Sequence, residues 1–130
     1  MVQQLYLAEW HDNFVRYINR LVVFVEGYLL LPQATEDYKK ELEKVKEILN
    51  GKDVEEIKKN LADGAKSGVL KKGVIEKIEK LDKEIIDFIS ERISIDSFWK
   101  EFLRQLSVLR IEQENDATIE KLKELRIPVV

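Results

Sequence analysis

The sequence predicts an all-α fold, a single-domain bundle of five or six helices. Apolar residues recur at spacings of three and four along nearly the whole chain, which is the period of one helix face. Only two prolines occur, Pro32 and Pro128, and no stretch shows the strict alternation of a half-buried strand. A length of 130 residues fits one domain, and no repeat or linker divides it.

The first helix is expected from about Gln3 to Leu31, because a residue before Pro32 is pushed out of the helical region. Its inner face consists of Leu7, His11, Phe14, Ile18, Leu21, Val25 and Tyr28. The opposite face is polar at first, with Glu9, Asn13, Arg16 and Arg20, and then becomes Val23 and Gly27. Since the second half is apolar nearly all round, it should be covered on several sides, by the bundle or by another copy of the chain. The candidate oligomer interface is Val23, Phe24, Tyr28, Leu30 and Leu31.

The next two helices have local start and stop signals. Thr35 is expected to cap an outer helix that Asn50 and Gly51 close. Asp53 then caps a third helix, with Glu56 three residues on as in a capping box.

The second half of the chain predicts three more helices. A long helix spans residues 74–93, and together with the first helix it should form the centre. The residues expected to supply a break and a cap are Ser94, Asp96 and Ser97. A fifth helix follows to about Asn115, and Asp116 caps a short last helix that Pro128 ends. The apolar ending RIPVV should lie on its own bundle or dock on a neighbouring chain.

Composition excludes several classes of site. The net charge is −3, so no field of the whole domain attracts nucleic acid or an anionic membrane. The chain has no cysteine, which excludes thiolate chemistry and fits a cytoplasmic setting. The run from Leu21 to Leu31 is shorter than the roughly 20 residues of a membrane span, and the start lacks a secretory signal. Abundant Lys, Glu and Ile resemble the usage of heat-adapted proteins.

No catalytic constellation is recognisable, so we expect no enzyme activity, no metal and no cofactor. The single histidine, His11, cannot supply the two histidines of a bundle di-iron site, and we interpret it as a structural residue at the core edge. Glu26 would transfer protons only if it were buried; otherwise it reaches the helix rim. The aromatic residues Phe98, Trp99 and Phe102 have the spacing of a buried stripe, which favours core over a stacking platform.

Residues 63–73 read DGAKSGVLKKG and hold three of the five glycines. The glycine spacing fits neither a P-loop nor the G-x-G-x-x-G pattern. We predict a helix boundary with Gly68 just past a helix end, or close helix approach at Gly64. The one clearly net-positive stretch of this size is the candidate anion or nucleic-acid patch, Lys66, Lys71 and Lys72.

These observations favour a non-enzymatic protein–protein interaction or assembly module. It would be a homodimer or a small helical subunit of a larger complex, without a membrane partner. The prediction depends on the apolar second half of the first helix and on the apolar tail. The alternative is a nucleic-acid-contacting subunit of a ribonucleoprotein or DNA-processing assembly, with the lysine patch on backbone phosphates.

Overall fold

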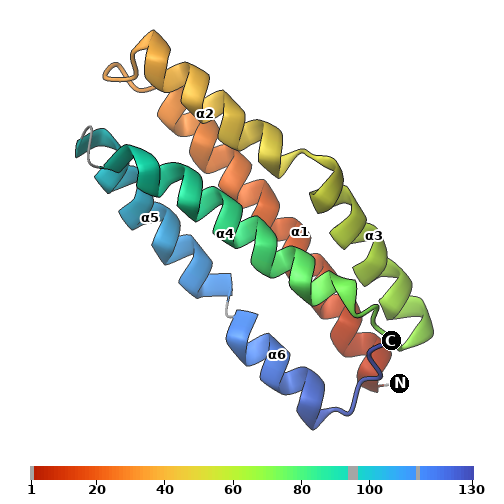
Figure 1. Ribbon diagram of the computed structural model, residues 1–130. Coiled ribbons are helices and arrows are strands. Elements are labelled where there is room, and N and C mark those ends of the chain that lie inside the picture. The colour runs from red at the N-terminus through yellow and green to blue at the C-terminus, as the bar shows by residue number, and fades with distance from the viewer. Residues whose placement is uncertain (1, 94–96, 114) are drawn as a thin grey trace.

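The computed structural model describes residues 2–93, 97–113 and 115–130, and it confirms the predicted all-α bundle (Figure 1). The helices within these residues are α1 (Val2–Leu29), α2 (Glu36–Leu49), α3 (Lys52–Ser67), α4 (Gly73–Ile93), α5 (Ser97–Gln113) and α6 (Asn115–Glu124). In this described part of the chain, no helix is both long and apolar enough to cross a membrane.

The helices form four antiparallel columns (Figure 1). α2 and α3 run antiparallel to α1. α4 runs parallel to α1, and α5 and α6 run antiparallel to both. α1 packs on α2, α3 and α5, whereas α4 packs on α3 and α5. This is an up-down-up-down bundle in which the second and fourth columns are each divided in two. The core therefore lies between four columns, which corrects the expectation that the first and fourth helices form a central pair.

The start of α2 confirms one predicted cap, and the start of α3 corrects another. Thr35 Oγ1 accepts a hydrogen bond from the Tyr38 N–H at 3.4 Å, as an N-cap residue does. α3 begins at Lys52, so Gly51 is its N-cap and makes no side-chain bond. Asp53 is therefore not the cap but lies in the first turn, where its charge still favours the positive end of the helix dipole.

The junction between α3 and α4 confirms the first of the two alternatives predicted for its glycines, a helix boundary with Gly68 just past the helix end. Gly68 ends α3 in the left-handed region, with φ 76°, and its N–H donates to Gly64 O at 2.7 Å. Gly64 is buried inside α3, and a Cβ added there would lie 3.5 Å from Leu7 Cδ1 of α1 and 3.2 Å from Val69 O. The tight distance is the one to Val69 O, so glycine leaves room for the backbone just past the end of α3, whereas the distance to Leu7 is an ordinary van der Waals contact.

The last two helices begin near the predicted positions. Ser94 and Asp96, which were expected at the break, lie outside the described residues, and α5 begins at Ser97. α6 begins at Asn115, so Asp116 lies inside the helix instead of capping it.

α6 ends in a turn that directs the chain back onto the bundle. Arg126 has a φ of 54°, and its N–H donates to Lys123 O at 3.1 Å. The Ile127 N–H donates to Leu122 O, also at 3.1 Å, and both of these side chains are buried. This is the Schellman arrangement, with a non-glycine residue in the left-handed position.

The tail lies on its own bundle, in agreement with the first of the two alternatives left by the sequence. The Leu70 N–H donates to Pro128 O at 2.8 Å, and the Val130 N–H donates to Leu70 O at 2.9 Å. The Lys72 N–H donates to Val130 O at 2.6 Å. We call these three hydrogen bonds the tail clip; they attach residues 128–130 to the junction between α3 and α4.

Candidate interaction surface

α1 is buried along one side and open along the other. Its inner residues are at most 5% exposed: Leu7, Trp10, Phe14, Tyr17, Ile18, Leu21 and Val25. Exposed residues three or four apart follow the opposite side. We call them the outer ridge, which consists of Val2, Leu5, Glu9, Asp12, Arg16, Arg20, Val23, Gly27 and Leu30.

The outer ridge has apolar ends and a charged middle. At the N-terminal end Val2 and Leu5 are 62% and 68% exposed. At the C-terminal end Val23 and Leu30 are 67% and 84% exposed. Between them the acids Glu9 and Asp12 precede the bases Arg16 and Arg20, and all four side chains are exposed. The bundle covers the second half of this helix on the inner side and on the side that faces α5, and it leaves the ridge itself exposed.

Gly27 lies on the outer ridge without a packing requirement inside the described chain. A Cβ built on it meets no atom within 4 Å. It therefore neither makes room for a neighbouring helix nor adopts a positive φ, the two usual structural reasons for a glycine.

The structure divides the five residues predicted as an oligomer interface. Phe24 and Tyr28 are half-buried, and each ring centroid lies 5.0 Å from that of Phe102 in α5. Val23, Leu30 and Leu31 are exposed. The sequence shows that this part of α1 is apolar on several sides, but not which side α5 covers.

Aromatic rings gather where α1 leads into α2 and α4 precedes α5. We call this region the aromatic end; its rings are Phe24, Tyr28, Tyr38, Phe98, Trp99 and Phe102. Tyr38 and Phe98 stack with centroids 4.2 Å apart. Trp99 and Phe102 are buried, and Phe98 is half-buried against them, which confirms the prediction that these three residues belong to the core.

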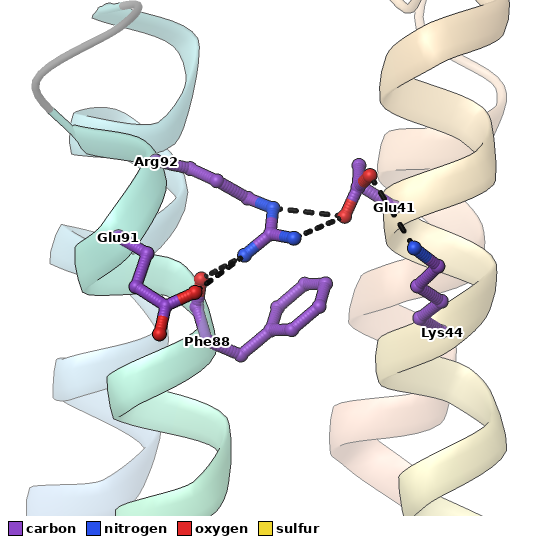
Figure 2. A network of polar contacts seen from close by, with 5 residues as sticks. All are labelled: Glu41, Lys44, Phe88, Glu91 and Arg92. Carbon is purple, nitrogen blue, oxygen red and sulfur yellow. Dashed lines mark hydrogen bonds and ion pairs between the residues drawn. The ribbon is translucent and has the colours of Figure 1, made fainter.

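An ion pair joins α2 to α4 beside the aromatic end (Figure 2). Arg92 Nε and Nη2 both donate to Glu41 Oε2, at 2.8 and 2.6 Å. The Arg92 guanidinium carbon lies 3.6 Å from the centroid of the Phe88 ring, and Nη1 donates to Phe88 O. Lys44 Nζ lies 3.6 Å from the other Glu41 oxygen. The charge-assisted bonds to Glu41 therefore join the second column to the third, and the cation–π contact within α4 helps to orient Arg92.

A groove of about 580 Å³ lies next to this ion pair, between α2 and the ends of α4 and α5. Tyr38, Trp99 and Arg92 contribute to its lining. Glu41 and Arg92, which both line the groove, already bind each other within the chain.

The three lysines of the predicted anion patch are exposed at the junction between α3 and α4. Lys66, Lys71 and Lys72 form no ion pair with any residue in the described ranges. The pKa of Glu56 is lowered chiefly by its hydrogen bond with Lys77 and to a smaller extent by Lys71. Lys71 therefore has an acidic neighbour that offsets part of the positive field.

His11 and Glu26 take the structural positions that the sequence favoured. His11 is half-buried, with Nδ1 3.0 Å from Asp12 Oδ1. Glu26 is exposed, and its carboxylate lies 3.4 Å from Lys46 Nζ of α2. Within the described residues, no three or more His, Asp or Glu side chains gather in a way suited to a metal ion.

A polar contact that the sequence did not suggest crosses the bundle between α1, α4 and α5. The Tyr17 hydroxyl donates to Asp82 Oδ1 at 3.4 Å, and Arg110 Nε lies 3.9 Å from the same oxygen. Burial, followed by the nearby Asp82 charge, raises the pKa of Tyr17. Tyr17 has the spacing of an apolar core position, so only the three-dimensional arrangement brings Asp82 and Arg110 to it.

Comparison of the chain with protein-family models, with curated proteins and with solved structures found no match.

Proposed function

We propose that this chain is a non-enzymatic helical module that assembles with another protein chain through the outer ridge of α1. The observation that carries the proposal is the exposure of Val23 on α1 and of Leu30 just past its end, while the inner side of α1 packs against three other helices. Large aliphatic side chains on one exposed helix face are typical of surfaces that another chain covers.

The division of the apolar residues supports this proposal. Phe24 and Tyr28 meet partners in α5, so the bundle uses one apolar side of α1 for its own core. Val23 and Leu30 remain exposed on the other side, next to Gly27. A flat position between two aliphatic side chains lets a partner helix approach the α1 backbone.

Site-specific cross-linking in cells tests the proposal. A photoreactive amino acid is placed at Val23 or at Leu30, and the control position is the exposed Glu43 on α2. Protein adducts are expected at the two ridge positions and not at position 43, and mass spectrometry identifies the second chain. Equal labelling at all three positions, or no adduct at Val23 and Leu30, would overturn the proposal.

A second candidate function is contact with nucleic-acid phosphates through Lys66, Lys71 and Lys72. It is supported by their exposure and by their position beside the first turn of α4, where helix N–H groups add partial positive charge. Phosphate contacts release counterions, so such binding should weaken steeply with salt.

Titration of RNA, single-stranded DNA and double-stranded DNA at low and moderate salt tests this candidate. The triple variant K66E/K71E/K72E should lose binding, whereas reversal of Lys121 and Lys123 on α6, which pair with Glu124 and Glu120, should change it little. Absence of binding at low salt, or equal binding by the triple variant, would remove the candidate.

A further inference from the structure

We infer that the partner of the outer ridge is a second copy of this chain, packed antiparallel so that the two α1 helices are related by a two-fold axis near residue 14. This inference rests on the proposed function and names its partner. It follows from the order of side chains along the ridge, which is aliphatic, acidic, basic and again aliphatic.

The ridge is complementary to itself only when one copy is reversed. In two antiparallel helices related by a two-fold axis, residues whose numbers have a constant sum lie at the same level. A sum of 28 to 29 brings every ridge position from Val2 to Gly27 opposite a suitable position of the second copy. The facing pairs are Val2 with Gly27, Leu5 with Val23, Glu9 with Arg20, and Asp12 with Arg16.

The charged middle selects this direction of packing. In the antiparallel arrangement each acid of one copy faces a base of the other, which gives four pairs of opposite charge across the axis. A parallel arrangement would place Glu9 and Asp12 against the same acids, and Arg16 and Arg20 against the same bases. Like charges in direct opposition cost free energy, so the parallel dimer is disfavoured.

The apolar ends of the ridge provide burial of apolar surface, which the charge pairs do not. Leu5 and Val23 are 68% and 67% exposed in the single chain. In the dimer, Leu5 of one copy would be covered by Val23 of the second copy, and Val23 by Leu5. Gly27 gives Val2 of the second copy room to approach, because nothing within 4 Å occupies the space of its missing Cβ. Over 28 residues α1 is about 42 Å long, so the paired ridges extend along most of the bundle.

Two charge-reversed variants test the inference. E9K/D12K makes the middle of the ridge basic throughout, and R16E/R20E makes it acidic throughout. Light scattering at micromolar concentration should give the unchanged chain about twice its mass of 15.3 kDa. Each variant alone should dimerise at least about tenfold more weakly, and an equimolar mixture of the two should recover the dimer mass.

Matched controls reverse charges elsewhere on the surface. E76K/E79K and K80E/K83E change two acids and two bases on the exposed side of α4. They should leave the dimer unchanged, and circular dichroism checks that all four variants keep their helix content. A monomeric unchanged chain, or a mixture that stays monomeric, would overturn the inference, as would equal dissociation of the α4 controls.

Thiol cross-linking tests the register independently, since the chain has no cysteine of its own. The variant L5C/V23C should join into a covalent dimer with a short bifunctional thiol reagent. L5C/L30C, whose numbers sum to 35, should react far less, and equal reaction of the two would overturn the register. If the chain is monomeric but Val23 cross-links to a different protein in cells, the second-copy inference fails while the proposed function stands.

Discussion

The two ends of this bundle are held together by different kinds of interaction. At the aromatic end, side chains from α1, α2 and α5 form one continuous group of rings, and Arg92 joins α4 to Glu41 of α2. At the opposite end, α6 and residues 125–130, which we call the tail end, bury only Leu122 and Ile127 among their described residues. Backbone hydrogen bonds of the tail clip and side-chain hydrogen bonds from Gln3 and Tyr6 of α1 to Leu125 O and Thr118 O hold them. Side-chain burial removes much apolar area from water, whereas a single hydrogen bond contributes little net free energy. The aromatic end should therefore contribute more to the global stability than the tail end, which should open locally.

The largest expected effect comes from removing a ring at the aromatic end. Phe102→Ala should lower the free energy of unfolding by about 3–5 kcal/mol, because Phe102 is fully buried and its ring contacts three other rings of the core. Leu122→Ala in α6 should instead release α6 and the tail locally. Hydrogen exchange checks the contrast: Phe102→Ala should speed exchange throughout the bundle, and Leu122→Ala only beyond α5. Global acceleration in both variants would contradict the comparison.

A smaller effect is expected at the ion pair beside the rings. Arg92→Ala should cost about 1–2 kcal/mol, because it removes a charge-assisted bond to Glu41 and the contact with the Phe88 ring. The matched control is Lys123→Ala at the tail end, whose exposed pair with Glu120 should contribute less than about 0.5 kcal/mol. Urea unfolding of the two variants measures both values, and equal losses would remove this distinction between the ends.

Tyr17 lies between the two ends, and its burial predicts a pH dependence. Its pKa is raised in the folded chain, so its contribution is fully present below about pH 10, the value of an unfolded tyrosine, and is lost as the pH rises further. Above pH 10 the unchanged chain should lose up to about 1.4 kcal/mol per pH unit more than Tyr17→Phe does. Unfolding by urea at pH 8 to 11 measures the difference, which should be absent if Tyr17 ionises freely in the folded chain.

The smallest expected effect is a gain at the tail end. Arg126 has a φ of 54°, which is costly for a residue with a side chain, so Arg126→Gly should stabilise the attachment of the tail by about 1 kcal/mol. Gly68→Ala should have the opposite sign, because its φ of 76° favours glycine. Exchange rates of the Leu70 and Lys72 amides, which donate to the tail, report both changes.

Local signals in the sequence predicted most of the architecture. Pro32, Thr35 and Gly68 placed helix ends to within a few residues, since each acts on its own backbone. Asp53 was assigned to the wrong position because Gly51 can start a helix without a side-chain bond. Start and stop signals are local, so they do not reveal the pairing of Leu70 with Val129, which lie 59 positions apart, or the contact between Tyr17 and Asp82.

The candidate surface was predictable only in part. Apolar residues around the second half of α1 indicated an extra contact, and Val23 and Leu30 are indeed exposed. Phe24 and Tyr28 belong instead to the aromatic end, because Phe98 and Phe102 of α5 lie opposite them. The charged part of the ridge was visible as a polar face, but its self-complementarity emerges only once those residues are known to be exposed on one side of a single straight helix.

Gly27 illustrates a conflict between the stability of the single chain and its proposed use. Alanine at this position would meet no neighbour. It would reduce the conformational entropy that α1 loses on folding, and so raise the free energy of unfolding by roughly 0.5–1 kcal/mol. The same methyl group would stand where Val2 of a second copy is proposed to approach. A laboratory selection for heat resistance alone should therefore replace Gly27 readily, and a selection that also requires assembly should retain it.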